Sequence, residues 1–242
     1  TDENPTCFLP KSPRRGHTII VRLNLRRGSP GKGKIALAAH WEVIKGLGRY
    51  CYMHISHPGY TGIAPVGHNR ANVVLVVDRN YLAGANVEQF FMKIVLENRL
   101  RRRILGGGAT VEKIRTVDSL AYSVKNPRCG GLLLVGDATG FIDPFTGEGI
   151  YLSLRSSQLA VGVVENAFDK SDFSSRQLQS YDLIRKKEFR KKNILSKVLQ
   201  RLIYKPYLCN RVIETLATQK ELSGLLVGVI GDYMPANKVV CF

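Results

Sequence analysis

Short apolar runs, several of them alternating with polar residues, dominate the first half of the chain. They cover residues 35–43, 50–56, 60–66 and 71–77, and turns rich in Gly, Pro and Asn separate them. Runs of this length bounded by such turns are typical of β-strands. The pattern predicts a meander of adjacent antiparallel strands.

Apolar residues elsewhere recur three or four positions apart, which is the spacing of a helix with one buried face. This spacing predicts helices over 86–100, 174–203, 206–217 and 221–230, and a further helix that carries Leu152. In 174–203 the apolar residues form a stripe opposite a Lys and Arg cluster: Leu178, Tyr181, Ile184, Phe189, Ile194, Val198 and Leu202. Such a stripe is usually core, and it can also lie on a membrane with its basic side toward the lipid heads.

The stretch 130–150 combines an apolar run with glycines and carboxylates. Residues 132–135 predict a strand buried on both faces, which Gly136 and Asp137 end. Three residues typical of turns and helix starts follow: Pro144, Gly147 and Gly149. A carboxylate at a strand end can accept hydroxyl groups, and a helix start offers unpaired N–H groups to an electron-rich oxygen or a phosphate. The alternative is a surface turn whose Asp caps the helix.

The order of residues in 136–150 resembles the second flavin motif of FAD-dependent oxidoreductases with the para-hydroxybenzoate hydroxylase fold, and is most similar to the geranylgeranyl-reductase-like branch. The resemblance implies that Asp137 hydrogen-bonds the ribityl chain of FAD. It also implies that N–H groups around 147–150 face N1 and the C2 carbonyl of the isoalloxazine ring, where the helix dipole would stabilise the anionic reduced flavin. The implied cofactor contacts are Gly136, Asp137, Ala138, Gly140, Pro144, Gly147, Glu148, Gly149 and Ile150.

The resemblance also gives a candidate substrate wall. Geranylgeranyl reductases carry a Tyr-x-Trp-x-Phe-Pro pattern beside the substrate, and the matching positions here are Tyr60, Gly62, Ala64 and Pro65. Gly62 and Ala64 replace the two aromatic residues, so the expected wall is smaller than that of a geranylgeranyl pocket. A packed strand tyrosine is the alternative role for Tyr60.

Members of the family carry an upstream GxGxxG that cradles the FAD pyrophosphate. Gly31-Lys32-Gly33 does not match it, because neither an apolar strand before it nor a helical pattern after it is present. We therefore expect this chain to be the C-terminal part of a longer flavoprotein, and to hold FAD poorly and be inactive on its own.

The predicted fold class is α+β: an antiparallel substrate-domain sheet, the C-terminal part of a FAD-binding α/β domain, and a helical C-terminal region. The expected boundaries are an irregular basic arm at 1–34, the sheet with one helix at 35–124, the FAD-binding strand, turn and helix at 125–168, and further helices at 169–242.

The formal charge of +17 is concentrated in basic blocks at 11–34, 99–103 and 185–192. Such blocks attract phosphate backbones and anionic lipid heads. The lack of a helix-turn-helix, zinc-finger or RNP-type signature argues against nucleic acid as a partner. A peripheral contact with an anionic membrane and a merely solvated basic surface both stay open.

The sequence argues against a membrane span, a metal site and a disulfide framework. No apolar run of the length of a membrane span and no signal-peptide pattern occurs. His54 and His57 have a metal-like spacing but no third ligand nearby. The cysteines are widely spaced without a CxxC, which favours a reducing cytoplasm: Cys7, Cys51, Cys129, Cys209 and Cys241.

Together these features predict a FAD-dependent oxidoreductase whose flavin carries the chemistry, with no catalytic side chain. Two reactions on a small apolar or aromatic substrate fit, the reduction of a carbon–carbon double bond and hydroxylation by a flavin monooxygenase, with NADPH or another reductant as electron donor. The alternative function is a non-catalytic basic module that binds an anionic membrane or nucleic acid.

Overall fold

The computed structural model describes residues 20, 23–27, 33–43, 47–120, 122–127, 129–141, 144–231, 233–234 and 239. The chain divides into two compact units. Ser29–Leu120 is called the sheet unit here, and Thr1–Gly28 together with Ala121–Phe242 is called the helical unit. An antiparallel sheet combined with helices confirms the predicted α+β class.

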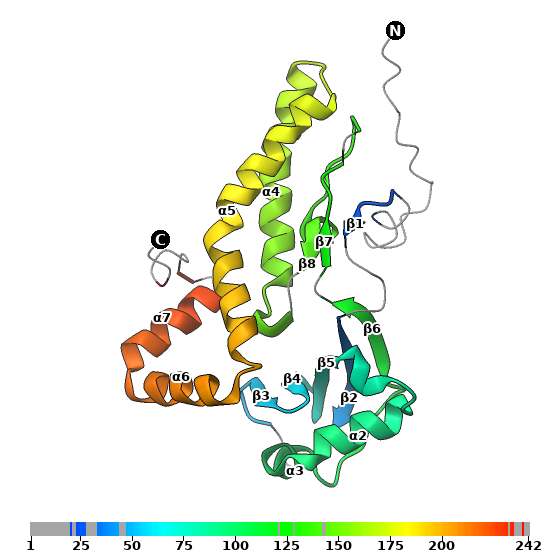
Figure 1. Cartoon of the computed structure of the whole chain (residues 1–242), viewed down its shortest axis with the longest axis vertical. Helices are drawn as coiled ribbons and strands as arrows, with labels where there is room; N and C mark the ends of the chain where they lie inside the picture. The colour runs from blue at the N-terminus through cyan, green and yellow to red at the C-terminus, as the bar shows by residue number, and fades with distance from the viewer. Residues whose placement is uncertain are drawn as a thin grey trace. The chain divides into compact units, whose positions relative to one another are not determined.

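A five-stranded antiparallel sheet forms the sheet unit, in the order β3-β4-β5-β2-β6 (Figure 1). Its strands are β2 Lys34–Glu42, β3 Tyr52–Ser56, β4 Gly59–Gly67, β5 Arg70–Asp78 and β6 Arg115–Leu120. β3, β4 and β5 form the predicted meander, but β2 pairs with β5 rather than β3. Both β2 and β5 have nine residues and present buried side chains in register, which stabilises their pairing at the sheet centre.

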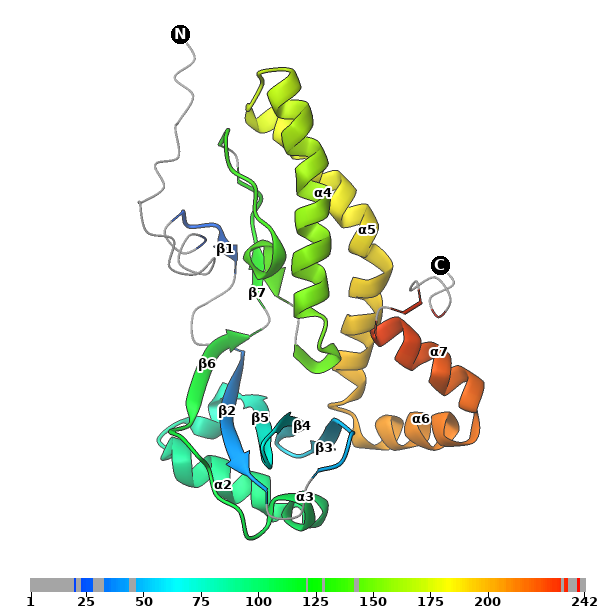
Figure 2. The same ribbon diagram turned by 180° about the vertical axis from the view of Figure 1, so that it is seen from behind.

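Helices α2 Val87–Glu97 and α3 Arg99–Leu105 cover one face of this sheet (Figure 2). The core on this face includes Leu37, Trp41, Ile63, Val73 and Phe91. The prediction of one helix over 86–100 is wrong, because Asn98 ends α2 and caps α3: its side chain accepts hydrogen bonds from the amides of Leu100 and Arg101. A single 3-10 turn, η1 Arg79–Leu82, follows β5.

The helical unit is built on α4 Gly149–Asp169 and α5 Ser175–Leu202, which lie side by side in both views (Figures 1 and 2). They pack through Ala160, Val163, Ala167, Leu178 and Tyr181. Helices α6 Pro206–Thr218 and α7 Lys220–Ile230 follow, and Val229 of α7 packs on Leu195 and Leu199 of α5. None of the described helices is long and apolar enough to cross a bilayer.

The buried face of α5 differs from the predicted stripe. Leu178, Tyr181 and Phe189 are buried as expected, but Ile184, Ile194 and Val198 are exposed. Lys192, which belongs to the predicted solvent-facing basic cluster, is buried instead. Over a helix of 28 residues, the side chains that face the neighbouring elements recur with a period of 3.6 residues. The positions of the predicted stripe depart from this period, so some of them fall on the exposed side of the helix.

The prediction of a paired strand at 132–135 is wrong for the described residues. The segment is irregular, with Leu132 and Leu134 buried in a cluster with Ile20 while Val135 is exposed. A strand needs a hydrogen-bonded neighbour, and no β-ladder of the described residues reaches this segment. The unbroken apolar run predicted a strand buried on both faces, but only Leu132 and Leu134 of this run are buried.

A small sheet of order β1-β7-β8 flanks that segment, with β1 Arg26–Arg27, β7 Tyr122–Val124 and β8 Gly140–Phe141. Most of the predicted irregular arm at 1–34 lies outside the described residues, but Arg26 and Arg27 pair with Val124 and Ser123.

The described cysteines differ in state. Cys51 and Cys209 are free thiols, whereas Cys129 is disulfide-bonded. This bond departs from the reduced state that the cysteine spacing indicated.

Candidate functional site

A buried hydrogen bond holds the Gly-Asp turn against α4. The turn is η2 Gly136–Thr139, in which the Thr139 hydroxyl donates to the Gly136 carbonyl at 2.8 Å. The Gly136 amide donates to the Ser156 hydroxyl of α4, also at 2.8 Å. Gly136 has a φ of +55°, and a Cβ there would lie 2.4 Å from Ser153 Oγ. Only glycine fits this position, so α4 can approach the turn closely.

The Asp137 side chain lines a cleft beside this turn and is open to solvent. The surrounding walls remove part of its hydration, which raises the pKa of the carboxyl group. Its backbone carbonyl accepts a 2.9 Å hydrogen bond from the Tyr122 hydroxyl. Tyr122 pairs across the strands with Phe141, with ring centres 6.3 Å apart. The Asp137 carboxylate, which can accept hydrogen bonds from hydroxyl groups, therefore lies beside the aromatic rings of Tyr122 and Phe141.

Helix α4 begins at the same cleft without a side-chain cap. Its N-cap residue is Glu148, whose side chain makes no capping hydrogen bond, so amides of the first turn carry the positive end of the helix dipole. The turn η3 Pro144–Thr146 leads into it, and Gly147 has a φ of +71°. A Cβ at Gly147 or Gly149 would meet no atom within 4 Å. A flat, electron-rich group therefore has room to approach this backbone.

These elements enclose a cleft of about 690 Å³ within the helical unit. The predicted cofactor contacts that line it are Gly136, Asp137, Gly140, Pro144, Gly147, Glu148, Gly149 and Ile150. Ala138 does not, because it packs against the cluster of Ile20, Leu132 and Leu134. All of the predicted cofactor contacts except Ala138 therefore lie around one cleft.

Helix α5 supplies lining residues that the sequence analysis did not assign to a site. Phe189, Asn193, Ser196, Lys197 and Gln200 all line the cleft. Their spacing places them on one helix face. Apart from Phe189 they are polar, and they recur at the helical spacing that normally marks a buried face. Polar residues at that spacing were the feature of the sequence that could have indicated a site on this helix.

Glu148 and Lys192 form a buried ion pair at the start of α4. The Lys192 ammonium lies 3.3 Å from Glu148 Oε1, and the Ser196 hydroxyl donates to Oε2 at 3.3 Å. The ammonium also lies 4.2 Å from the centre of the Tyr151 ring. Burial raises the pKa of Glu148 and lowers the pKa of Lys192, and the attraction between the two groups opposes both shifts.

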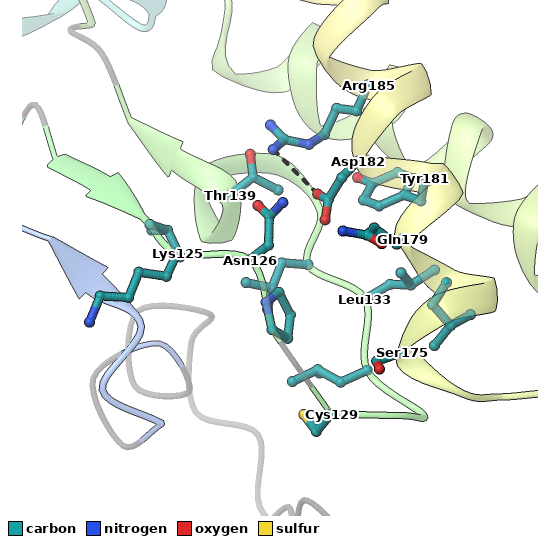
Figure 3. Close-up of a pocket in the computed structure, with 15 residues that line it drawn as sticks. Lys125, Asn126, Cys129, Leu133, Thr139, Ser175, Gln179, Tyr181, Asp182 and Arg185 are labelled. Carbon is teal, nitrogen blue, oxygen red and sulfur yellow. Dashed lines mark ion pairs between the residues drawn. The ribbon is translucent and has the colours of Figure 1, made fainter.

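A second, much smaller pocket of about 20 Å³ lies beside α5 (Figure 3). Asp182 and Arg185 project from α5 toward Asn126 and Thr139, and Asp182 Oδ1 lies 3.7 Å from Arg185 Nη2. Burial raises the pKa of Asp182, and the Arg185 charge opposes this. The space suits roughly a water molecule rather than a cofactor.

The predicted substrate residues lie on β4 of the sheet unit. Tyr60, Gly62 and Ala64 alternate with the buried Thr61 and the core residue Ile63, so they share the sheet face that α2 and α3 do not cover. Pro65 pairs with the core residue Ala71 next to a register shift, and therefore does not share that face. Tyr60 is only 3% exposed, as a packed tyrosine would be.

The two histidines with metal-like spacing differ in their contacts. The ring nitrogen of His57 lies 2.9 Å from the Tyr81 hydroxyl. The His54 ring stacks near Tyr52, with ring centres 6.2 Å apart, and its Nε2 atom is buried without a hydrogen-bond partner among the described residues. In the part of the chain that the structure describes, no three His, Cys, Asp or Glu side chains are grouped as metal ligands.

The family model for squalene epoxidase matches residues 86–212, more than half of the chain. The chain belongs to the squalene epoxidase family. The matched range contains the whole Gly-Asp motif, α4 and α5, and so most of the cleft lining. A relative, the digeranylgeranylglycerophospholipid reductase of Thermoplasma acidophilum, is 28% identical over 146 residues, which are 58% of this chain and 35% of the reductase. The chain therefore spans about a third of the length of that relative.

Solved structures share the fold of this squalene epoxidase family member. A flavin-dependent brominase superposes with a TM-score of 0.71 at 14% identity, over 89% of this chain and 55% of the brominase. A geranylgeranyl bacteriochlorophyll reductase-like protein from Thermoplasma acidophilum gives a TM-score of 0.64 at 21% identity, over 88% of this chain and 55% of its own. At these identities the likeness concerns the fold.

Proposed function

We propose that this member of the squalene epoxidase family is the C-terminal part of a FAD-dependent oxidoreductase that acts on an apolar substrate. One observation carries the proposal: the Asp137 carboxyl and an uncapped helix start with open space over Gly147 and Gly149 meet in one cleft. The comparisons support the same class of protein, since one matched protein is named as a digeranylgeranylglycerophospholipid reductase and another as a flavin-dependent brominase.

The residues present fit the ribityl and isoalloxazine parts of FAD. Asp137 would accept hydrogen bonds from ribityl hydroxyls, and the amides of 147–150 would face the electron-rich edge of the ring. Tyr122 and Phe141 would contribute apolar contacts beside it. When bound, FAD would supply the redox chemistry, and this chain's residues would bind it, orient it and limit the access of water.

The dipole of α4 would stabilise negative charge at the ring edge, and so favour the reduced form of the cofactor. The face of β4 with Gly62 and Ala64 would form the substrate wall, with 35–124 as substrate domain and 125–168 as FAD-binding segment. The buried Tyr60 would be a packed tyrosine rather than a substrate contact. The pyrophosphate contacts, and the site for NADPH or another reductant, would come from a longer polypeptide that includes this chain.

Two reactions fit this arrangement, reduction of a carbon–carbon double bond and oxygenation of an apolar substrate. Both need a water-poor pocket, and the product formed from a prenyl or polycyclic substrate would distinguish them. The alternative of a non-catalytic basic module accounts for neither the cleft nor the motif that surrounds it.

We further propose a peripheral contact between this chain and anionic membranes. The surface that supports this contact is the exposed face of α5, where Leu183 and Ile184 lie close to Lys187. A face that combines exposed apolar and basic side chains is typical of helices that lie on lipid. An apolar substrate would then be taken from the bilayer.

The test uses the longer polypeptide recovered with its upstream coding sequence. It should contain a GxGxxG motif, purify yellow and show a flavin absorption band. Asp137→Ala should weaken FAD binding by about one to three kcal/mol, because a hydroxyl–carboxylate hydrogen bond is lost. Asp169→Ala is the control, since this exposed residue ends α4 far along the helix from the cleft.

Fluorescence titration with FAD gives both affinities. Equal affinity of the wild type and Asp137→Ala would remove the role given to Asp137. A colourless protein that binds anionic surfaces in a salt-sensitive way would favour the basic module instead.

A further inference from the structure

Lys192 is buried in a helix whose neighbouring basic residues are exposed. Its relative exposure is 7%, whereas Lys186, Lys187 and Arg190 face solvent. An ammonium group is costly to bury unless a counter-charge and hydrogen bonds compensate. The compensation here is specific, since Glu148, also 7% exposed, and the Tyr151 ring both contact the ammonium.

Glu148 is the N-cap residue of α4 but does not cap the helix with its side chain. As the N-cap of α4 it could accept hydrogen bonds from the first amides, yet its side chain makes no capping bond. Its carboxyl contacts Lys192 and Ser196 of α5 instead, and the Thr146 hydroxyl is a further hydrogen-bond partner. Glu148 therefore does not cap the amide end of α4, and among the described residues no other side chain caps it.

The charge of this pair matters because Glu148 lines the cleft next to Gly147 and Gly149. An unpaired carboxylate there would repel an electron-rich ligand and offset the helix dipole. An ammonium that neutralises the carboxylate removes this repulsion. Lys197 also lines the cleft, but it is exposed, and no ion pair joins it to Glu148 among the described residues.

We propose that Lys192 is a positioning residue of the cofactor site, which holds Glu148 against α5, neutralises its charge and keeps the amide end of α4 free for the reduced flavin. The proposal rests on the FAD-dependent function proposed above. It assigns a function to α5, which lies outside the flavin motif, and it makes the reduction potential of the cofactor depend on a pair of residues from two helices.

The experiment measures the reduction potential of bound FAD in the longer flavoprotein that contains this chain. Glu148→Gln leaves the Lys192 charge in place and should raise the potential. Lys192→Gln leaves a carboxylate and should lower it, as long as the carboxyl stays ionised. Burial raises the pKa of that carboxyl and lowers the pKa of the ammonium that remains in Glu148→Gln. The potentials are therefore measured over a pH series, in which Lys192→Gln is compared with the wild type at alkaline pH and Glu148→Gln at acidic to neutral pH. The double variant restores a net charge of zero and should return close to the wild-type potential.

Each single change should alter the ratio of the affinities for reduced and oxidised FAD by about tenfold, because it places one unit of charge close to the ring. Lys192→Arg keeps the charge and should stay near the wild type. Lys187→Gln is the matched control, since it removes the same charge from an exposed position of the same helix.

Opposite shifts that cancel are the signature of an electrostatic role, since a packing defect would not reverse in the double variant. Shifts of the same sign in the two single variants, a double variant that keeps the full shift of one single variant, or no shift in the single variants would overturn the inference while FAD binding by the wild type upholds the proposed function. A wild-type protein that binds no FAD would overturn both. Thermal unfolding of every variant shows which of them are folded. If Lys192→Gln does not fold, the two single variants Lys192→Arg and Glu148→Gln still test the charge effect.

Discussion

The amide of Gly136 donates its hydrogen bond to the hydroxyl of Ser156, so the turn that carries Asp137 is fixed to α4 by one side chain of that helix. Ser156 in turn donates to the carbonyl of Ser153 within α4. The Gly136 amide is buried, and water cannot readily replace the Ser156 hydroxyl. The position of the Gly-Asp turn relative to the helix start therefore depends on this contact.

Ser156→Ala should lower the free energy of unfolding by about one to three kcal/mol, because a buried amide loses its acceptor. Ser157→Ala is the matched control: the Ser157 hydroxyl donates to the carbonyl of Ser153 within its own helix, and its loss should have a small effect. Urea unfolding of the two variants gives the comparison. Equal stabilities would show that the Gly136–Ser156 bond does not hold the turn.

Asp137→Asn should change the pH dependence of stability in the absence of FAD. The surroundings raise the folded-state pKa of Asp137 above its usual value, so ionisation of the folded protein carries a cost that is absent below the unfolded-state pKa and complete above the folded-state pKa. Asn removes this cost. The variant should therefore gain stability relative to the wild type as the pH rises through the raised pKa.

Thermal melts at acidic and neutral pH test this. A melting-temperature difference that is independent of pH, or that grows toward acid, would contradict the raised pKa. The same variant should bind FAD more weakly than the wild type, so the carboxylate would trade stability for binding.

Arg101→Met should destabilise the sheet unit. Arg101 is 1% exposed. Its guanidinium donates to the carbonyls of Val95 and Ile94 at the end of α2, at 2.9 and 2.6 Å, and to the Ser56 hydroxyl of β3 at 2.7 Å. Its removal leaves carbonyls at a helix end unsatisfied, which should cost about three kcal/mol or more.

Arg102→Met is the neighbouring control, because the exposed Arg102 also donates to a carbonyl near the end of α2, that of Leu96, but in contact with solvent. Chemical denaturation of both variants compares them. A loss in Arg102→Met as large as that in Arg101→Met would show that burial of the guanidinium does not matter.

The sequence predicted most of the elements because the signals for them are local. Glycines and prolines mark the turn at 136–149, and the helical period marks α4 to α7. Asn98 is also a local signal, since Asn is a favoured N-cap, but the continuous apolar spacing across it concealed the break between α2 and α3.

The features that the sequence did not predict depend on contacts between distant residues. The place of β2 beside β5 follows from pairing that no local pattern encodes. Lys192 lies within a run of basic residues, and only its contact with Glu148, from another helix, explains its burial. For the same reason the polar residues of α5 were not assigned to the cleft, whereas those of the compact motif at 136–150 were.

The exposed face of α5 should bind anionic lipid through Lys186, Lys187 and Arg190, and not through Lys192, which is buried in its ion pair. Each basic residue near an anionic surface contributes about one kcal/mol, so replacing these three with Gln should weaken binding to phosphatidylserine-containing vesicles by about a hundredfold. Added salt should weaken the wild type in the same way.

Replacing the exposed Leu183 with Ser should weaken binding further and in a salt-independent manner, because insertion of an apolar side chain does not depend on screening. Vesicle sedimentation at low and high salt measures both effects, with neutral phosphatidylcholine vesicles as the control. A wild-type chain that stays in the supernatant with anionic vesicles at low salt would show that this face is merely solvated, and the apolar substrate would then have to reach the cleft by another route.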